Sequence, residues 1–160
     1  MPRFPRFDLT NQVALVTGAA RGIGRATALA LADAGADVAL GLRVRSRGND
    51  VADEIRAGGR RALPLQLDVA DLTQVTSAVA ETVERFGRID LLVNNAGIGP
   101  ENPAEQVNER DFDATCAVNL KGTFFVSQAV ARVMIRQQSG RIVNLSSQAG
   151  FVALPGESVY

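Results

Sequence analysis

Short apolar segments rich in valine and leucine alternate along this chain with segments of helical composition. Strands without a polar face are buried on both sides, as in a parallel sheet that carries helices on each face. The alternation predicts one α/β domain over residues 1–160, built on a doubly wound parallel sheet. The expected strands span residues 13–17, 37–42, 62–67, 91–94 and 141–145, and the expected helices span residues 22–34, 49–57, 72–86 and 109–136.

The first expected strand leads into a glycine-rich turn, Thr17-Gly18-Ala19-Ala20-Arg21-Gly22-Ile23-Gly24, which opens the first expected helix. Glycine adopts positive φ without steric cost and lets a ligand approach the bare backbone. The start of a helix adds unpaired N–H groups and the positive end of the helix dipole, which together suit a phosphate. The turn therefore predicts a phosphate-binding site, and the alternative is a tight strand-to-helix turn without a ligand.

The composition is that of an ordinary globular protein, with 46% hydrophobic and 21% charged residues in a chain of 160. Basic and acidic residues number 17 each, so no bulk field attracts nucleic acid or an anionic membrane, and we expect neither partner. No apolar run reaches the length of a bilayer span. Residues 1–7 lack the apolar core of a signal peptide and are expected to form a short tail over the first strand. We therefore expect a cytoplasmic protein.

The chain contains no histidine and one cysteine, Cys116. These counts exclude Ser-His-Asp hydrolases, Cys-His proteases and the usual zinc sites, so no metal centre is expected. A proton transferred near neutral pH must come from a carboxylate, a tyrosine, a lysine or water. Cys116 lies within a helical pattern and is expected to be a buried thiol. The pair Phe124-Phe125 is expected to lie in the core rather than in an interface.

The unusual polar and glycine-rich segments all follow the carboxyl ends of the expected strands. In an open parallel sheet, ligands bind beyond those ends, near the point where the strand order reverses. One ligand-binding rim is therefore expected. It combines residues 18–24, Arg43, Asp68-Val69, residues 94–97 and Ser146-Ser147.

Five features, in the same order along the chain, resemble the short-chain dehydrogenase/reductase family. They are the turn at residues 17–24 with its Gly-x-x-x-Gly-x-Gly spacing, Asn94-Asn95-Ala96-Gly97, Asn119 in a long helix, Ser147, and Tyr160. The resemblance covers residues 8–160. It implies a Rossmann-type NAD(P)-binding fold and an NAD(P)-dependent oxidoreductase that interconverts a small-molecule alcohol and a carbonyl. The pattern is similar to the group that holds 3-oxoacyl-acyl-carrier-protein reductases and sugar or polyol dehydrogenases.

The resemblance also implies a role for each matching residue. Tyr160 would be the catalytic acid and base, Ser147 would hydrogen-bond the reacting oxygen, and Asn119 would help to hold a proton-relay water. Asp68 would contact the adenine amine and Val69 would line the ring, whereas Asn94 would be structural. The implied cofactor-binding residues are Gly18, Arg21, Gly22, Ile23, Gly24, Arg43, Asp68, Val69, Asn95, Ala96 and Gly97.

The family also has a lysine four positions after the tyrosine, where it lowers the pKa of the phenol, which is ~10 in water. The sequence ends at Tyr160, and its lysine, Lys121, lies on the Asn119 helix. We therefore expect the cofactor-binding portion of a longer oxidoreductase, with its fifth strand left at an open edge. The alternative is a non-catalytic nucleotide-binding fragment or regulator. The complete protein is expected to form a homo-oligomer, partly through the helix at residues 109–136.

The residues after the second expected strand bear on the choice of cofactor. An acidic side chain there binds the 2′-hydroxyl of NAD, whereas an arginine suits the 2′-phosphate of NADP. The usual acidic position falls on Leu42, Arg43 follows it, and Arg45 and Arg47 lie just beyond. NADP(H) is therefore predicted over NAD(H), and the alternative is that these arginines form a solvated loop. Arg21, Arg43 and Tyr160 together disfavour a methyltransferase-like nucleotide site.

Overall fold

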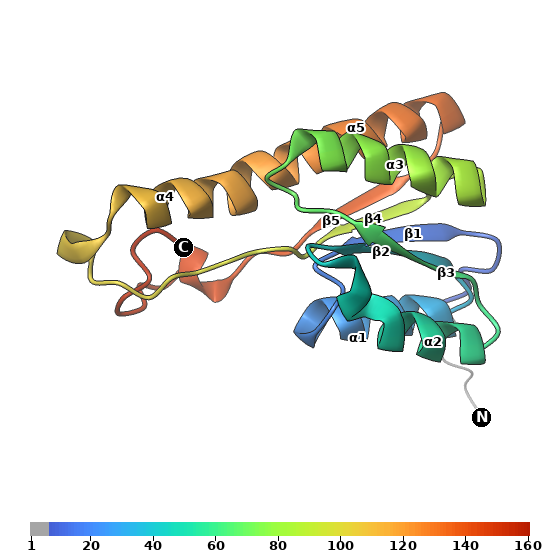
Figure 1. Ribbon diagram of the computed structural model, residues 1–160, viewed down its shortest axis with the longest axis horizontal. Coiled ribbons are helices and arrows are strands. Elements are labelled where there is room, and N and C mark those ends of the chain that lie inside the picture. Colours follow the sequence, from blue (N-terminus) through green and yellow to red (C-terminus); the bar gives the residue numbers. More distant parts are fainter. Residues whose placement is uncertain (1–6) are drawn as a thin grey trace.

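A five-stranded parallel sheet forms the centre of the computed structural model, which describes residues 7–160 (Figure 1). The strands are β1 (Val13–Thr17), β2 (Asp37–Leu42), β3 (Ala62–Gln66), β4 (Leu91–Asn94) and β5 (Arg141–Asn144). Their order in the sheet is β3-β2-β1-β4-β5. The predicted doubly wound sheet is confirmed, and the strand order reverses between β1 and β4. The expected tail lies almost wholly in residues 1–6, outside the described residues.

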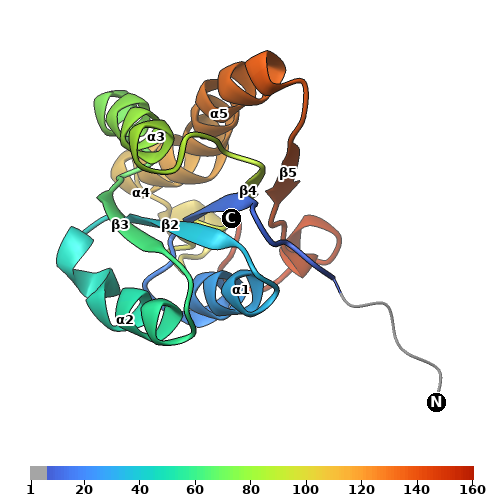
Figure 2. The same ribbon diagram turned by 90° about the vertical axis from the view of Figure 1, so that its right-hand side faces the viewer.

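Helices cover both faces of this sheet (Figures 1 and 2). On one face lie α1 (Gly22–Asp33) and α2 (Asn49–Ala57). On the other lie α3 (Leu72–Phe86) and α5 (Thr123–Gln137), and α4 (Glu109–Thr115) extends beyond the sheet. Short helical turns complete the fold. They are η1 (Arg45–Gly48), η2 (Ala104–Gln106), η3 (Cys116–Gly122) and η4 (Gln148–Gly150).

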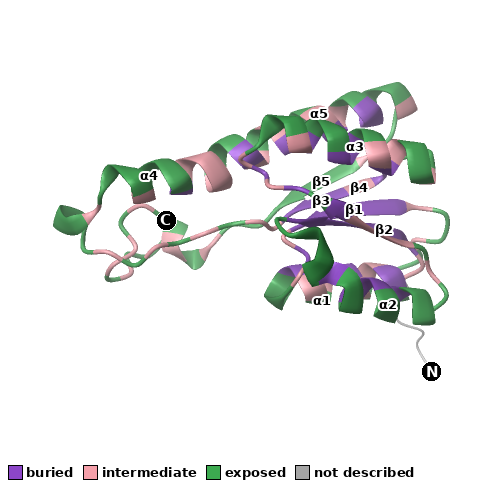
Figure 3. Ribbon diagram, viewed as in Figure 1, coloured by how far each residue is buried: buried purple, intermediate pink, exposed green. Residues whose placement is uncertain are grey.

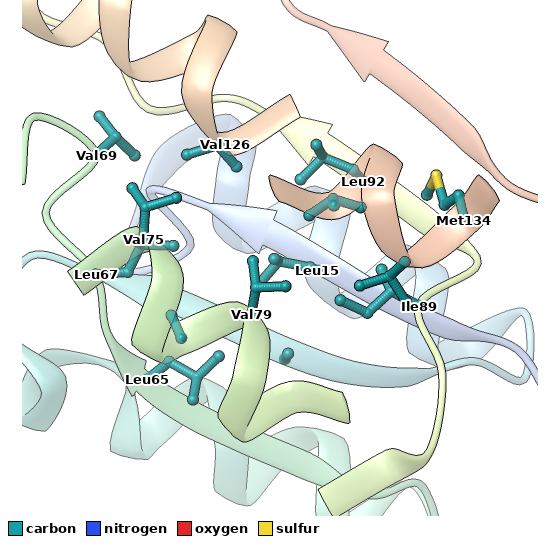
Figure 4. Packing of buried hydrophobic residues seen from close by; sticks show 14 residues of the cluster. Leu15, Leu65, Leu67, Val69, Val75, Val79, Ile89, Leu92, Val126 and Met134 are labelled. Atoms are coloured by element: carbon teal, nitrogen blue, oxygen red, sulfur yellow. The ribbon is translucent and has the colours of Figure 1, made fainter. Parts of the chain in front are cut away.

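The central strands are buried because apolar residues point to both faces of the sheet. Every residue of β1 and β2 is buried (Figure 3). Successive side chains in a strand alternate between faces, so Leu15 belongs to the core under α3 and α5 while Val16 belongs to the core over α1 and α2. Figure 4 shows Leu15 of β1 and Leu92 of β4 packed near Val79 of α3 and Met134 of α5. These two cores hold the carboxyl ends of the strands in a fixed arrangement.

Side-chain caps and a glycine set the ends of α3 and α4. Asn108 precedes α4, and its Oδ1 accepts a hydrogen bond from the Asp111 N–H at 2.9 Å. Asp71 caps α3 in the same way, accepting from the N–H groups of residues 73 and 74. Gly87 ends α3 with a φ of +82°, in the left-handed region that favours glycine.

The predicted helix at residues 109–136 is helical throughout and ends at Gln137, but its middle, η3, is π-helical rather than α-helical. Such turns insert one extra residue into a helix and are common at functional sites. Two contacts accompany it here. Asn119 hydrogen-bonds the backbone of Ile98, and Gly122 lies so close to Val69 that a Cβ on the glycine would be 2.8 Å from the Val69 Cγ2. A regular helix would shift these two residues relative to each other.

Three smaller expectations are also corrected. Phe124 is 59% exposed rather than in the core, and its ring packs edge-on against Phe125 with the centroids 5.2 Å apart. Cys116 is half-buried rather than buried. The regular ranges of α1, β3 and β5 each end one residue earlier than predicted, at Asp33, Gln66 and Asn144.

The open edge expected at the fifth strand is confirmed within residues 7–160, where β5 pairs with β4 alone. All four residues of β5 are exposed, including Ile142 and Val143. Unpaired backbone groups and apolar side chains on one strand form a surface that can pair with another chain. Within the described residues, no helix is both long and apolar enough to cross a membrane.

Asp37, at the start of β2, supports the sheet through Arg60 and Arg61. Burial alone raises the pKa of Asp37, but the Arg61 N–H and the two guanidinium groups outweigh it and hold the pKa below its ordinary value of 3.8. This carboxylate therefore stabilises the fold above pH 3.8, and the stabilisation is lost as the pH falls through the lowered pKa. We expect Asp37→Asn to lower the free energy of unfolding by about 2 kcal/mol near neutral pH. The deficit, measured in urea titrations, should shrink in acid, and an equal deficit in acid would contradict this account.

Candidate active site

The glycine turn presents open backbone at the start of α1. Gly18 and Gly22 have φ angles of +67° and +54°, and a Cβ added at Gly22 would meet no atom within 4 Å. Arg21 occupies the N-cap without a side-chain cap hydrogen bond, and the first turn of α1 carries no acidic residue. The N–H groups of this turn therefore keep their capacity to bind an anion. Arg21 and Ile23 are exposed beside it, and Ile23 is 66% exposed.

Asn95 fastens this turn to the end of β4. Its Nδ2 donates to the carbonyl oxygens of Thr17 at 2.9 Å and Gly18 at 3.2 Å. In return, the Thr17 Oγ1 accepts from the backbone N–H groups of Asn95 and Ala96, each at 3.0 Å. The structure thus brings the two predicted cofactor-binding segments together. The Thr17 hydroxyl, which sequence reasoning did not assign to the site, holds them in place.

Gly24 packs against the same contact. A Cβ at Gly24 would lie 2.4 Å from both the Gly18 carbonyl oxygen and the Asn95 Nδ2, and one at Gly18 would lie 2.9 Å from that Nδ2. No side chain fits at these distances. Close packing of the turn therefore requires glycine at position 24. At position 22 the positive φ favours glycine, although a Cβ there would meet no other atom.

Asn94 has a structural role, as the resemblance implied. It is 4% exposed, and its Nδ2 donates to the Ser127 Oγ and the Asn144 Oδ1, each at 2.8 Å. These bonds join β4 to α5 and to β5 below the rim of the sheet.

Asn119 lies in η3 and holds the loop after β4. Its Oδ1 accepts from the Ile98 N–H at 2.9 Å, and its Nδ2 donates to the Ile98 carbonyl oxygen at 2.7 Å. A Cβ added at Gly97 would lie 3.5 Å from the same Oδ1. Both polar atoms of the amide are thus engaged with one residue, which fixes the path of the chain beside Gly97.

Tyr160, in the segment after η4, packs against this same loop. A Cβ at Gly99 would be 2.9 Å from the tyrosine Cδ2, so the ring lies directly against the Gly99 backbone. The segment before it is held by the Asn102 N–H, which donates to the Gly156 carbonyl oxygen at 2.8 Å. The ring is close-packed on one side, while 46% of the residue remains exposed. The structure therefore brings Tyr160 and Asn119 to one loop.

Ser147 follows β5 and opens η4. Its Oγ accepts a hydrogen bond from the Ala149 N–H at 3.2 Å, and the residue is half-buried, whereas Ser146 is exposed. Within the described residues, no hydrogen bond joins Ser147 to Tyr160. The serine hydroxyl keeps its proton as a donor for another acceptor.

The second end of the rim lies beyond β2 and β3. Arg43 is exposed, and within residues 7–160 it has no ion-pair partner. Arg45 differs, because its guanidinium pairs with Glu81 of α3 at 3.1 Å. Asp68 accepts from the Ala70 N–H at 3.0 Å. Val69 is 5% exposed and its side chain packs in the core.

A doubly wound parallel sheet with an open glycine turn where the strand order reverses defines a Rossmann-type nucleotide-binding fold. The chain belongs to the short-chain dehydrogenase family, whose model matches residues 12–160.

Similar proteins agree with this membership. The 3-oxoacyl-[acyl-carrier-protein] reductase of Synechocystis is 44% identical over 153 residues, which are 95% of this chain and 62% of that protein. A solved structure of NAD⁺-bound xylitol dehydrogenase superposes with a TM-score of 0.91 at 38% identity, covering 95% of this chain and 59% of the other. A 7α-hydroxysteroid dehydrogenase complexed with NADH and 7-oxo glycochenodeoxycholic acid gives 0.92 at 30% identity, covering 97% and 60%. The chain thus spans about three fifths of the length of these relatives.

Proposed function

We propose that this chain is the cofactor-binding portion of an NADP(H)-dependent oxidoreductase that interconverts an alcohol and a carbonyl by hydride transfer. The observation that carries the proposal is the open glycine turn at the start of α1, fastened through Asn95 and Thr17 to the loop after β4, which Asn119 and Tyr160 contact at Ile98 and Gly99. A nucleotide bound at the turn would extend along this loop toward the tyrosine. The relatives named above are enzymes, which favours this function over a non-catalytic nucleotide-binding module.

The residues present fit a dinucleotide. Because residues 18 and 24 are glycines, no side chain of theirs separates the turn from Asn95. Gly22 leaves free space on the outer side of the turn. The N–H groups at the start of α1 would hold the pyrophosphate, and the exposed Ile23 and the backbone of residues 95–97 would lie along the cofactor. A bound nicotinamide would supply or accept the hydride.

The side chains of this chain would handle the proton. In the reductive direction, the Tyr160 hydroxyl would donate its proton to the carbonyl oxygen, and Ser147 would hydrogen-bond that same oxygen. One hydride to carbon and one proton to oxygen convert the carbonyl to the alcohol, and the reverse transfers oxidise it. A tyrosine hydroxyl stays protonated at neutral pH, so it acts as a base in the oxidative direction only if a nearby cation lowers its pKa. Asn119 would orient the loop through which a relay water returns the proton.

The substrate is either a 3-oxoacyl thioester or a sugar or polyol. The Synechocystis relative is a 3-oxoacyl-[acyl-carrier-protein] reductase and one solved relative is a xylitol dehydrogenase, so both classes are represented. The test follows the loss of NADPH absorbance with a panel that contains a 3-oxoacyl thioester, ketoses and simple ketones. Turnover of one class by the complete protein identifies the substrate, and no turnover by the complete protein with any of them would count against the catalytic function.

Arg43 is the residue that we propose to bind the 2′-phosphate of the cofactor. Two solved relatives carry NAD⁺ or NADH, so the preference must come from this chain's own side chains. No carboxylate follows β2 before Asp50, whereas Arg43 is exposed and without an ion pair in the described part of the chain. We expect Arg43→Ala to weaken NADPH binding by roughly tenfold and NADH binding by less than about twofold, measured by isothermal titration. Arg47→Ala is the control, and equal losses for both nucleotides would contradict the assignment.

We propose that the complete protein is a homo-oligomer that associates partly through the α4–α5 region. Phe112, Leu120 and Phe124 are each at least 50% exposed along this stretch, at 50%, 72% and 59%. Large apolar side chains exposed together mark surfaces that associate with other chains. The predicted cytoplasmic location remains a prediction.

A further inference from the structure

Gln66, the last residue of β3, clamps the loop that carries Arg43. Its Oε1 accepts a hydrogen bond from the Arg45 backbone N–H at 3.1 Å, and its Nε2 donates to the Arg43 carbonyl oxygen at 2.6 Å. These are the two backbone groups that a neighbouring parallel strand would bond. The side-chain amide therefore ties the chain just after β2 to the end of β3.

Gln74, in the first turn of α3, supports this clamp from the other side. Its Oε1 accepts from the Gln66 Nε2 at 3.4 Å and from the Asp68 N–H at 2.9 Å. Its Nε2 donates to the Oδ2 of Asp71, the N-cap of α3, at 3.0 Å. The chain of hydrogen bonds thus begins at a fixed helix end. It reaches Asp68 on one side of the expected adenosine site and Arg43 on the other.

Arg45 adds a second attachment of the same loop to α3. Its guanidinium is held by Glu81 at 3.1 Å, while its N–H is held by Gln66. Arg43 has no such partner among residues 7–160, so the direction of its side chain depends on the backbone that Gln66 holds. The backbone on both sides of Arg43 is therefore anchored, while its guanidinium, like that of Arg47, has no ion-pair partner among residues 7–160.

We propose that Gln66 is a positioning residue that sets the preference of this chain for a 2′-phosphate over a 2′-hydroxyl on the adenosine ribose. The proposal rests on the proposed function, in which Arg43 binds that phosphate. Guanidinium groups recognise phosphate through paired, directional hydrogen bonds, so the contact is sensitive to where the arginine backbone lies. A 2′-hydroxyl forms no such contact with Arg43. Loss of the clamp should therefore weaken the binding of a 2′-phosphate selectively.

The test compares two probes that lack nicotinamide, 2′,5′-ADP and 5′-AMP, which differ in the 2′-phosphate. Isothermal titration should show that Gln66→Met weakens 2′,5′-ADP by roughly tenfold and 5′-AMP by less than about twofold. Methionine keeps the length of the glutamine and removes both hydrogen bonds. Gln12→Met is the matched control, because Gln12 precedes β1 at the opposite end of the sheet, and it should leave both affinities unchanged.

Gln74→Met provides a second variant if Gln66→Met fails to fold. It should weaken both probes, because it also frees the Asp68 N–H, and it should weaken 2′,5′-ADP more. An unchanged ratio of the two dissociation constants in a folded variant would overturn the role of Gln66. A wild-type protein that bound neither probe would instead overturn the proposed function. A wild-type protein that bound 5′-AMP as tightly as 2′,5′-ADP would overturn the NADP(H) assignment, and the role of Gln66 with it.

Discussion

Replacing Gly24 with alanine is expected to abolish measurable NADPH binding and to lower the free energy of unfolding by about 3 kcal/mol. The added Cβ would be 2.4 Å from the Gly18 carbonyl oxygen, which belongs to the backbone and cannot rotate away. It would be equally close to the Asn95 Nδ2, whose hydrogen bonds fasten the turn to β4. The turn must therefore open. For a chain of this length, the thermal midpoint should fall by roughly 6–12 °C, measured by circular dichroism.

Gly58→Ala is the matched control for this substitution. Gly58 follows α2 with a φ of −76°, and the nearest atom to an added Cβ is the Ile55 carbonyl oxygen at an ordinary 3.4 Å. Alanine is favoured over glycine in ordinary helical conformations by up to about 1 kcal/mol, so this variant should be neutral or slightly stabilised. If Gly24→Ala behaved like Gly58→Ala and still bound NADPH, the close packing of the turn could not be what shapes the nucleotide site.

The sheet could be predicted from the sequence because burial on both faces leaves a strong local signal. The predicted ranges of β1, β2 and β4 match the structure residue for residue. The end of β3 was harder to predict. Leu67 still donates its N–H to the Leu42 carbonyl oxygen at 2.7 Å, although the regular strand ends at Gln66. A pattern of residue types does not distinguish a last paired residue from a first unpaired one.

The π-helical turn at η3 lies beyond what the sequence indicates. Its residues continue the helical pattern of α4, and an α-turn and a π-turn differ by a single residue. The geometry is coupled to residues far away in sequence, through Asn119 on Ile98 and Gly122 against Val69. Tertiary contacts of this kind override local preference.

The sequence indicates which residues form the candidate site, but not which hydrogen bonds and ion pairs hold them in place. The glycine turn and the loop after β4 were assigned to one rim from sequence, and the structure joins them through Asn95 and Thr17. The pairing of Arg45 with Glu81 spans 36 positions and left no trace in the local pattern. The hydrogen bonds of Gln66 could not be predicted either, because an exposed glutamine at a strand end is typical of a solvated surface.

Tyr160→Phe is expected to reduce the rate of carbonyl reduction by about 10²–10⁴-fold while leaving NADPH affinity within about twofold, because general acid catalysis contributes on that scale. The substitution removes the phenolic hydroxyl and keeps the aromatic ring. The contact of the ring with Gly99 is made by carbon atoms, Cδ2 and Cγ among them, so phenylalanine should keep the same position. Single-turnover kinetics with NADPH and the substrate that the panel identifies measure the chemical step. A fluorescence titration measures cofactor binding.

The adjacent serines supply the control for this experiment. Ser147→Ala should also slow the chemical step, because it removes a hydrogen-bond donor to the reacting oxygen, whereas Ser146→Ala should not. Ser147 is half-buried at the start of η4 and Ser146 is exposed, so the two positions differ in their access to the rim. A Tyr160→Phe protein with unreduced turnover would show that the proton comes from elsewhere. Because the chain has no histidine, the proton source would then have to be a carboxylate, the Lys121 ammonium or a water held at the loop beside Asn119.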